Sequence, residues 1–221
     1  MVNTIGELVP LAVAVAASPV QIVAAIAILT GDRPRRPALA FLAGWMPALL
    51  VVVLAVSAIP GLYGGSASPS TAAAWARLVL GALLVVVAVK SWRSRPGPGE
   101  VPEPPAWLER AETLGPARSF VLGAALVANP KILLLAAGAG MVIGQAQLSA
   151  AQQLGTAVVF VALGSSTVIA PVLAYLAGGD RATTLLASAR RELVQHSAAI
   201  TAAVLVILGA VLIGDAIEVL L

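Results

Sequence analysis

The stretch LVANPKILLL, from Leu126 to Leu135, lies inside an apolar run at about residues 119–143 that is long enough to cross a membrane. Asn129, Pro130 and Lys131 stand side by side within it. A proline inside a helix removes a backbone donor and clashes with the carbonyl one turn earlier. A charged side chain in the hydrocarbon core is costly and is a functional hypothesis by default. The stretch therefore predicts a membrane helix that is kinked near its centre, with a cation at the kink.

The composition is that of an integral membrane protein. Of the 221 residues, 60% are hydrophobic and 10% are charged, whereas a soluble domain carries about 25% charged residues. The absence of cysteine excludes disulfides, thiolate metal sites and thiol nucleophiles. No soluble basic domain carries the net charge of +3, so we interpret this charge as a topology signal and expect no nucleic-acid partner.

Six segments are apolar over roughly 20 residues, the length that crosses a bilayer. These continuous runs lack the alternating polarity of a transmembrane β-barrel, so we predict an all-α membrane protein with six transmembrane helices. The first is expected to be a retained helix rather than a signal peptide, because the residues before its apolar run include Glu7 but no Lys or Arg. The predicted spans are residues 7–30, 37–59, 72–92, 119–143, 151–177 and 196–219.

Basic residues gather in alternate connections between these spans. The positive-inside rule puts such connections in the cytoplasm, and with six spans it puts both termini outside. We therefore expect a multi-pass protein of the plasma membrane with its N- and C-termini outside. The basic residues concerned are Arg33, Arg35, Arg36, Lys90, Arg93, Arg95, Arg110, Arg118, Arg181, Arg190 and Arg191.

The two halves of the chain resemble each other. Three motifs of the first half recur in the same order in the second, and the offset between matched residues grows along the chain. The pairs are AVAASPVQIV (14–23) with ALVANPKILL (125–134), AFLAGWM (40–46) with VALGSS (161–166), and LVLGALL (78–84) with VILGAVL (206–212). They align Pro19 with Pro130, Gly44 with Gly164, and Gly81 with Gly209. Three helices per half is an odd number, so the halves insert in opposite orientations as an inverted repeat, which is common in secondary transporters.

The repeat defines the expected organisation of the chain. Residues 1–95 form the first three-helix repeat, residues 96–117 a cytoplasmic linker and residues 118–221 the second repeat. The linker is rich in Pro and Gly from Pro96 to Pro105. Ala106 to Gly115 is either a short interfacial helix or a solvated tether.

In inverted-repeat folds, broken helices at matching positions form the substrate site near the membrane midplane. Lys131 lies roughly 12 residues into its span, or about 18 Å deep. It is either the counter-charge of an anionic head group or a side chain that snorkels to the interface, and its depth favours the first. Asn129 and Ser18 either belong to the site or satisfy backbone groups freed by Pro130 and Pro19.

Gln21 lies two residues after Pro19 and either contacts substrate or bonds across helices. The candidate substrate-binding residues are thus Lys131, Asn129, Pro130, Ser18, Pro19 and Gln21. Trp45, Ser165 and Thr167 are interpreted as packing residues between helices. No catalytic triad, paired carboxylates, phosphate-binding loop or metal-ligand cluster stands out, so we expect neither an enzyme nor a cofactor.

Three of these features together resemble one known family. They are the SP of the first span, RPRRPALAFLAGW (Arg33 to Trp45), and the NPK of the fourth span with its Leu-, Ala- and Gly-rich continuation. The chain is similar over essentially its whole length to the GAP family of sulfolipid-addressing (Sap) and peptidoglycolipid-addressing proteins, within the LysE exporter superfamily. The resemblance implies a three-plus-three helix repeat and the movement of such lipids to the cell surface. It supplies no catalytic residues.

Our hypothesis is a membrane translocator that moves a lipid or lipid conjugate, of an anionic glycolipid or peptidoglycolipid type, toward the cell surface. Two alternatives stay open: a small-solute exporter of the amino-acid type, and a non-transporting accessory scaffold for a larger lipid exporter. The expected partners are the lipid substrate and the membrane, with either a homodimer or association with a larger lipid exporter.

Overall fold

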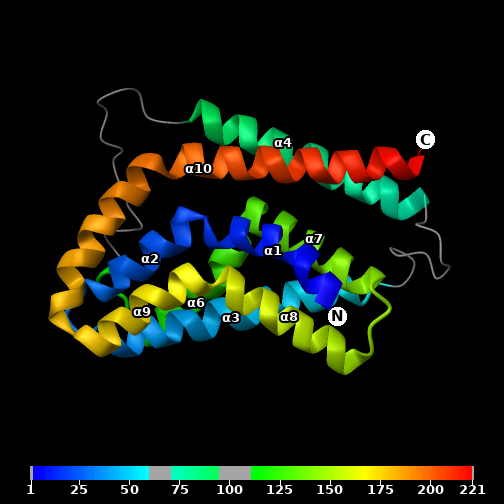
Figure 1. Cartoon of the computed structure of the whole chain (residues 1–221). Coiled ribbons are helices and arrows are strands. Elements are labelled where there is room, and N and C mark those ends of the chain that lie inside the picture. Colours follow the sequence, from blue (N-terminus) through cyan, green and yellow to red (C-terminus); the bar gives the residue numbers. More distant parts are fainter. Residues whose placement is uncertain (1, 60–70, 95–110, 221) are drawn as a thin grey trace.

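In the computed structural model, which describes residues 2–59, 71–94 and 111–220, every regular element is an α-helix (Figure 1). The predicted all-α architecture is thereby confirmed. Residues 96–110 of the predicted linker (96–117), which include its Pro- and Gly-rich part and the first half of Ala106–Gly115, lie outside the described residues. The helices are α1 (Val2–Ala16), α2 (Pro19–Leu29), α3 (Arg35–Ser57), α4 (Thr71–Arg93), α6 (Pro116–Val127), α7 (Pro130–Gln145), α8 (Ala150–Gly164), α9 (Ser166–Gly178) and α10 (Asp180–Leu220).

Three segments are long and apolar enough to cross a membrane unbroken: α3, Ala74–Arg93 of α4, and Ala202–Leu220 of α10. Three helix pairs meet the same criterion only when each pair is taken together. They bend at a short break, by 54° between α1 and α2, 67° between α6 and α7, and 64° between α8 and α9. With each bent pair as one span, the described residues contain the six spans expected from the sequence.

The breaks in the first and fourth spans lie where the sequence predicted kinks. In both, the proline is the first residue of the new helix, Pro19 in α2 and Pro130 in α7. Proline suits this position, because the backbone donor that it lacks would have no partner inside the helix. The preceding residues, Ser18 and Asn129, have ψ angles of 114° and 127°, as the ring of a following proline favours. The chain is therefore interrupted at these points rather than bent within one continuous helix.

The fifth and sixth spans differ from the prediction. The fifth, predicted as one helix over residues 151–177, breaks at Ser165, whereas Pro171 lies inside α9 without interrupting it. The connection predicted after residue 177 is helical from Asp180 and continues into the last span as α10. Gly179 separates the two helices with a φ of 55°, a backbone conformation that glycine adopts at little cost. The polar stretch that follows is rich in Ala, Leu and Arg, all good helix formers.

Helices α4 and α10 lie side by side along one side of the molecule (Figure 1). Glycines bring their backbones close together. A Cβ added at Gly81 would lie 2.9 Å from the carbonyl oxygen of Gly209, and a Cβ added at Gly209 would lie 2.9 Å from that of Gly81. Each would also meet the side chain four residues beyond the facing glycine, Ile213 or Val85. The contact is therefore reciprocal, as at a local two-fold axis.

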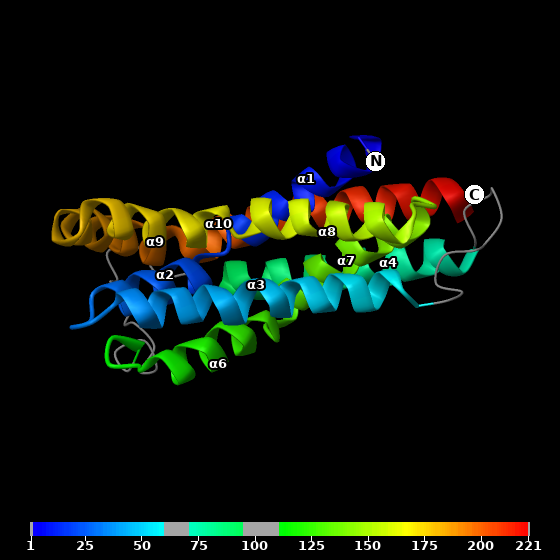
Figure 2. The same cartoon turned by 90° about the horizontal axis from the view of Figure 1, so that it is seen from below.

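The remaining helices pack around two apolar clusters. The larger joins α1, α3, α7 and α8 around Trp45, Phe160 and Leu135, together with residues of α4 and α10. The smaller joins α2, α3 and α9 around Phe41 and Val172. Helices α3 and α6 run in close contact (Figure 2). A glycine in each helix, Gly44 in α3 and Gly123 in α6, permits this close approach.

Both chain termini lie at one end of the molecule, and the α2–α3 connection lies at the other (Figures 1 and 2). The second end also receives the C-terminal end of α4 and the start of α6. These segments carry described basic residues, so we call it the basic end. The residues are Arg33, Arg35, Arg36, Lys90, Arg93 and Arg118.

Candidate functional site

The break in the first span leaves carbonyls at the end of α1 without partners inside the helix. Two side chains donate hydrogen bonds to these carbonyls. Gln21 Nε2 donates to the carbonyl of Val15 at 2.7 Å, and Thr167 Oγ1 of α9 donates to the carbonyl of Ala16 at 2.7 Å. Unpaired backbone groups cost several kcal/mol in hydrocarbon, so these bonds stabilise the broken helix. The hydrogen bond of Gln21 links the two halves of the broken span, and its predicted contact with a substrate stays a prediction.

The break in the fifth span is joined to the same region. The indole Nε1 of Trp45, from α3, donates to Ser165 Oγ at 3.0 Å. Trp45 and Ser165 are both fully buried, and a buried indole N–H needs an acceptor. The hydrogen bonds of Thr167 and Trp45 thus hold the first and fifth breaks together with α3. The sequence analysis interpreted Trp45, Ser165 and Thr167 as packing residues, but it could not predict their hydrogen-bond partners.

The break in the fourth span carries the predicted cation. Asn129 Oδ1 accepts the backbone N–H of Lys131 at 3.2 Å and caps α7. Lys131 is the second residue of α7, and its side chain is only 8% exposed. A helix N-terminus carries a partial positive charge, so the helix end and the ammonium group reinforce each other. This arrangement favours an anion near the break.

The matching break in the first span has no such cap. Ser18 precedes α2, is 2% exposed, and makes no side-chain cap hydrogen bond. Among the described residues its Oγ has no hydrogen-bond partner. Pro19 is buried, whereas Pro130 is exposed. The two breaks therefore share their backbone geometry but differ in their surroundings.

The six candidate residues divide between the two breaks, with Ser18, Pro19 and Gln21 at one and Asn129, Pro130 and Lys131 at the other. Helices α1 and α7, which each border one break, pack against each other. The fifth break joins the first through Thr167 and was missed from the sequence. A run of serine and threonine after a glycine was its one local signal.

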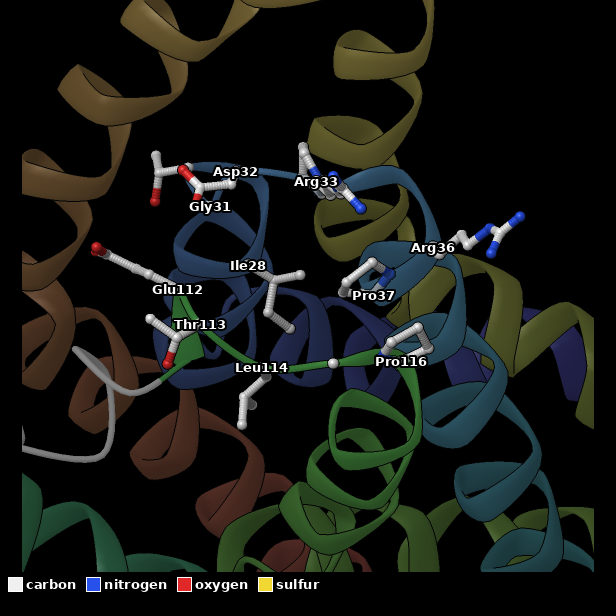
Figure 3. Close-up of a pocket in the computed structure, with 13 residues that line it drawn as sticks. Ile28, Gly31, Asp32, Arg33, Arg36, Pro37, Glu112, Thr113, Leu114 and Pro116 are labelled. Atoms are coloured by element: carbon white, nitrogen blue, oxygen red, sulfur yellow. The ribbon is translucent and has the colours of Figure 1, made fainter.

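A pocket of about 700 Å³ lies at the basic end, between the α2–α3 connection and the segment that leads into α6. Asp32 and Glu112 lie on one side of it and Arg33 and Arg36 on the other (Figure 3). The sequence associated the arginines of this pocket with membrane topology, but it did not predict a pocket. Apolar and small residues complete the lining, namely Ile28, Thr30, Gly31, Pro34, Pro37, Thr113, Leu114, Gly115 and Pro116.

These features define a class: a multi-pass α-helical membrane protein with interrupted spans and a buried cation at one interruption. Within that class, the model of the family described as Sap, sulfolipid-1-addressing protein (SfLAP), matches residues 8–218. The chain therefore belongs to this family, and the predicted resemblance to sulfolipid-addressing proteins is confirmed, whereas membership of the LysE exporter superfamily stays a prediction. The family is described by lipid addressing rather than by an enzymatic reaction. No curated protein and no solved structure matches the chain.

Proposed function

We propose that the protein is a plasma-membrane translocator that moves an anionic lipid or lipid conjugate toward the cell surface, with Lys131 as the counter-charge of its head group. The family description supports a role in lipid addressing. The main observation in support of a substrate site is Lys131, a buried cation in the first turn of α7 beside an interruption of the fourth span. Two positive contributions meet there, and an anionic head group would neutralise both.

Four features support an inverted repeat around this site. Pro19 and Pro130, which the repeat aligns, each begin the second half of a broken span. Gly81 and Gly209, also aligned, meet in a reciprocal contact. The second span packs on the fourth, and the first packs on the fifth. The third and sixth spans pack on each other. Exchanging the halves leaves this set of contacts unchanged, and rocking of such halves provides alternating access.

The distribution of charge supports the orientation. Among the described residues, more Lys and Arg lie at the basic end than at the end that holds both termini (Figure 1). We place the basic end in the cytoplasm, and both termini outside, by the positive-inside rule.

A flipping assay in vesicles tests the proposal. The purified protein is reconstituted into phosphatidylglycerol vesicles that contain a fluorescent phosphatidylglycerol, and loss of fluorescence on adding a membrane-impermeant quencher reports exchange between leaflets. We expect the wild-type protein to accelerate exchange, Lys131→Ala to slow it at least tenfold, and Lys131→Arg to retain most of the rate. Lys90→Ala is the matched control, because Lys90 is exposed at the end of α4.

The outcomes separate the two parts of the proposal. Full activity of Lys131→Ala would refute the role of Lys131. Failure of the wild-type protein to accelerate exchange of any anionic lipid, together with uptake of labelled amino acids, would replace the lipid translocator with a small-solute exporter. Absence of both activities, with stable co-purification of a larger exporter, would favour the accessory scaffold.

A further inference from the structure

The break in the first span leaves two sets of backbone groups without partners inside a helix, namely the last carbonyls of α1 and the first N–H groups of α2. The carbonyls accept hydrogen bonds from the side chains of Gln21 and Thr167. The N–H groups have no such partner, because Ser18, at the capping position, makes no cap hydrogen bond. At the matching break Asn129 caps α7. The acceptor side of the first break is thus satisfied by side chains, whereas its donor side is not capped.

Ser18 adds a side-chain donor at the same place. It directly precedes α2, its side chain is 2% exposed, and its Oγ has no hydrogen-bond partner among the described residues. Gln21 and Ile22, in the first turn of α2, are buried as well. Burying a polar group without a hydrogen bond is costly, and such groups are rare in native structures. A buried hydroxyl at an uncapped helix end therefore indicates an acceptor that the described residues do not supply.

The cation of the fourth break lies at a similar level. Helices α1 and α7 pack on each other and run in opposite directions, since α1 leads to the first break and α7 leads away from the fourth, back toward the end that holds the termini (Figure 1). They meet where Leu11 faces Gly138, at which an added Cβ would lie 3.7 Å from the Leu11 side chain. Ser18 follows Leu11 by seven residues, and Lys131 precedes Gly138 by seven. The two breaks are therefore at a similar distance from this contact, on the same side of it.

We propose that Ser18 Oγ and the first N–H groups of α2 bind oxygen atoms of the same anionic head group that Lys131 neutralises, an inference that rests on the function proposed above. Both half-helices present an N-terminus at this level, and each N-terminus carries about half a positive charge. Helix N-termini bind phosphate in this way. A tetrahedral oxyanion such as a phosphate ester offers several acceptor oxygens and fits this set of donors. Ser18 and Lys131 are both buried, so the head group reaches them when the two halves rock apart.

Binding of a short-chain anionic lipid tests the inference. The full chain in dodecyl maltoside is titrated with dioctanoyl phosphatidylglycerol, and native mass spectrometry counts the bound lipid. Dioctanoylglycerol, which lacks the phosphate, is the neutral probe and should bind much more weakly. Ser18→Ala should weaken binding of the anionic lipid about tenfold, as the loss of a hydrogen bond to a charged group does. Wild-type affinity in Ser18→Ala, or equal binding of the neutral probe, would overturn the inference.

Two further variants locate the site. Ser119→Ala is the matched control, because Ser119 is also fully buried and its Oγ also has no described partner, but it lies in the first turn of α6 and not at a break. A loss of affinity as large as in Ser18→Ala would show a general effect of removing a buried serine and would contradict the assignment. Ser18→Asn copies the residue at the matching break, where Asn129 caps its helix. It should resist unfolding better than wild type and bind the lipid more weakly, and greater stability with unchanged binding would refute a ligand at this helix end.

The same titration of Lys131→Ala separates this inference from the proposed function. Weaker binding in Lys131→Ala but not in Ser18→Ala would overturn the inference and leave the counter-charge in place. Weaker binding in Ser18→Ala alone would refute the role of Lys131 and with it the shared head group. Calorimetry with inorganic phosphate distinguishes the source of the oxyanion. Phosphate binding that Ser18→Ala abolishes supports a free ion as ligand, whereas binding of the lipid alone supports a head group.

Discussion

Substitution of Gly209 by alanine tests the contact between α4 and α10 quantitatively. A Cβ at this position would lie 2.9 Å from the carbonyl oxygen of Gly81 and 2.7 Å from Cγ2 of Val85. Ordinary contacts of a Cβ begin near 3.4 Å, so the two backbones must separate by about 0.5 Å at this point. The Val85 side chain can adjust, whereas the carbonyl oxygen moves only with its helix.

The cost follows from two opposing effects. Alanine in a helix is about 0.5–1 kcal/mol more favourable than glycine, and overpacking a close contact costs about 1–3 kcal/mol. Gly214 of the same helix is the matched control, because an added Cβ there meets nothing within 4 Å. The free energy of unfolding of Gly209→Ala should therefore be lower than that of Gly214→Ala by about 1–3 kcal/mol.

Unfolding of the purified variants in mixed micelles of dodecyl maltoside and sodium dodecyl sulfate, followed by circular dichroism, provides the measurement. The double variant Gly81→Ala/Gly209→Ala should cost less than the sum of the single variants, because the first substitution already separates the helices. If Gly209→Ala is as stable as Gly214→Ala, the two helices are not in contact at these glycines, and the reciprocal contact is wrong.

The hydrogen bonds at the breaks give two further predictions in the same unfolding assay. Thr167→Val removes the donor to the carbonyl of Ala16 and should cost about 0.5–1.5 kcal/mol, as for side-chain hydrogen bonds in other membrane proteins, while the exposed Ser166→Ala should change little. Asn129→Ala removes the cap of α7 and should cost about 1 kcal/mol, whereas Ser18→Ala, which removes no described hydrogen bond, should lie within about 0.5 kcal/mol of wild type. An equal loss in Ser18→Ala and Asn129→Ala would refute the capping role.

Local chemistry explains which breaks could be predicted. Pro19 and Pro130 restrict the backbone of the preceding residue whatever surrounds it, so the sequence predicted both positions. The break at Ser165 depends on tertiary contacts, namely the hydrogen bonds from Trp45 and to α1, and has no proline to mark it. Pro171 lies inside α9 without interrupting it.

The candidate site was predictable only in part. The burial of Lys131 followed from its depth in an apolar run, and its 8% exposure confirms that the side chain is buried. The hydrogen bond of Gln21 did not follow, because its acceptor, the Val15 carbonyl, comes within reach only through the geometry of the break. The pocket was not foreseen, since it joins residues near Asp32 to residues near Glu112, whose proximity is a property of the whole fold.

Two half-helices connect the pocket to the breaks. Helix α2 begins at the first break and ends beside the pocket at Ile28, and α6 begins beside the pocket at Pro116 and ends at the fourth break. They have 11 and 12 residues, or about 16–18 Å of length, close to half of a hydrocarbon core of about 30 Å. The pocket and the two proline breaks therefore lie at opposite ends of the same pair of half-helices, one from each half of the chain.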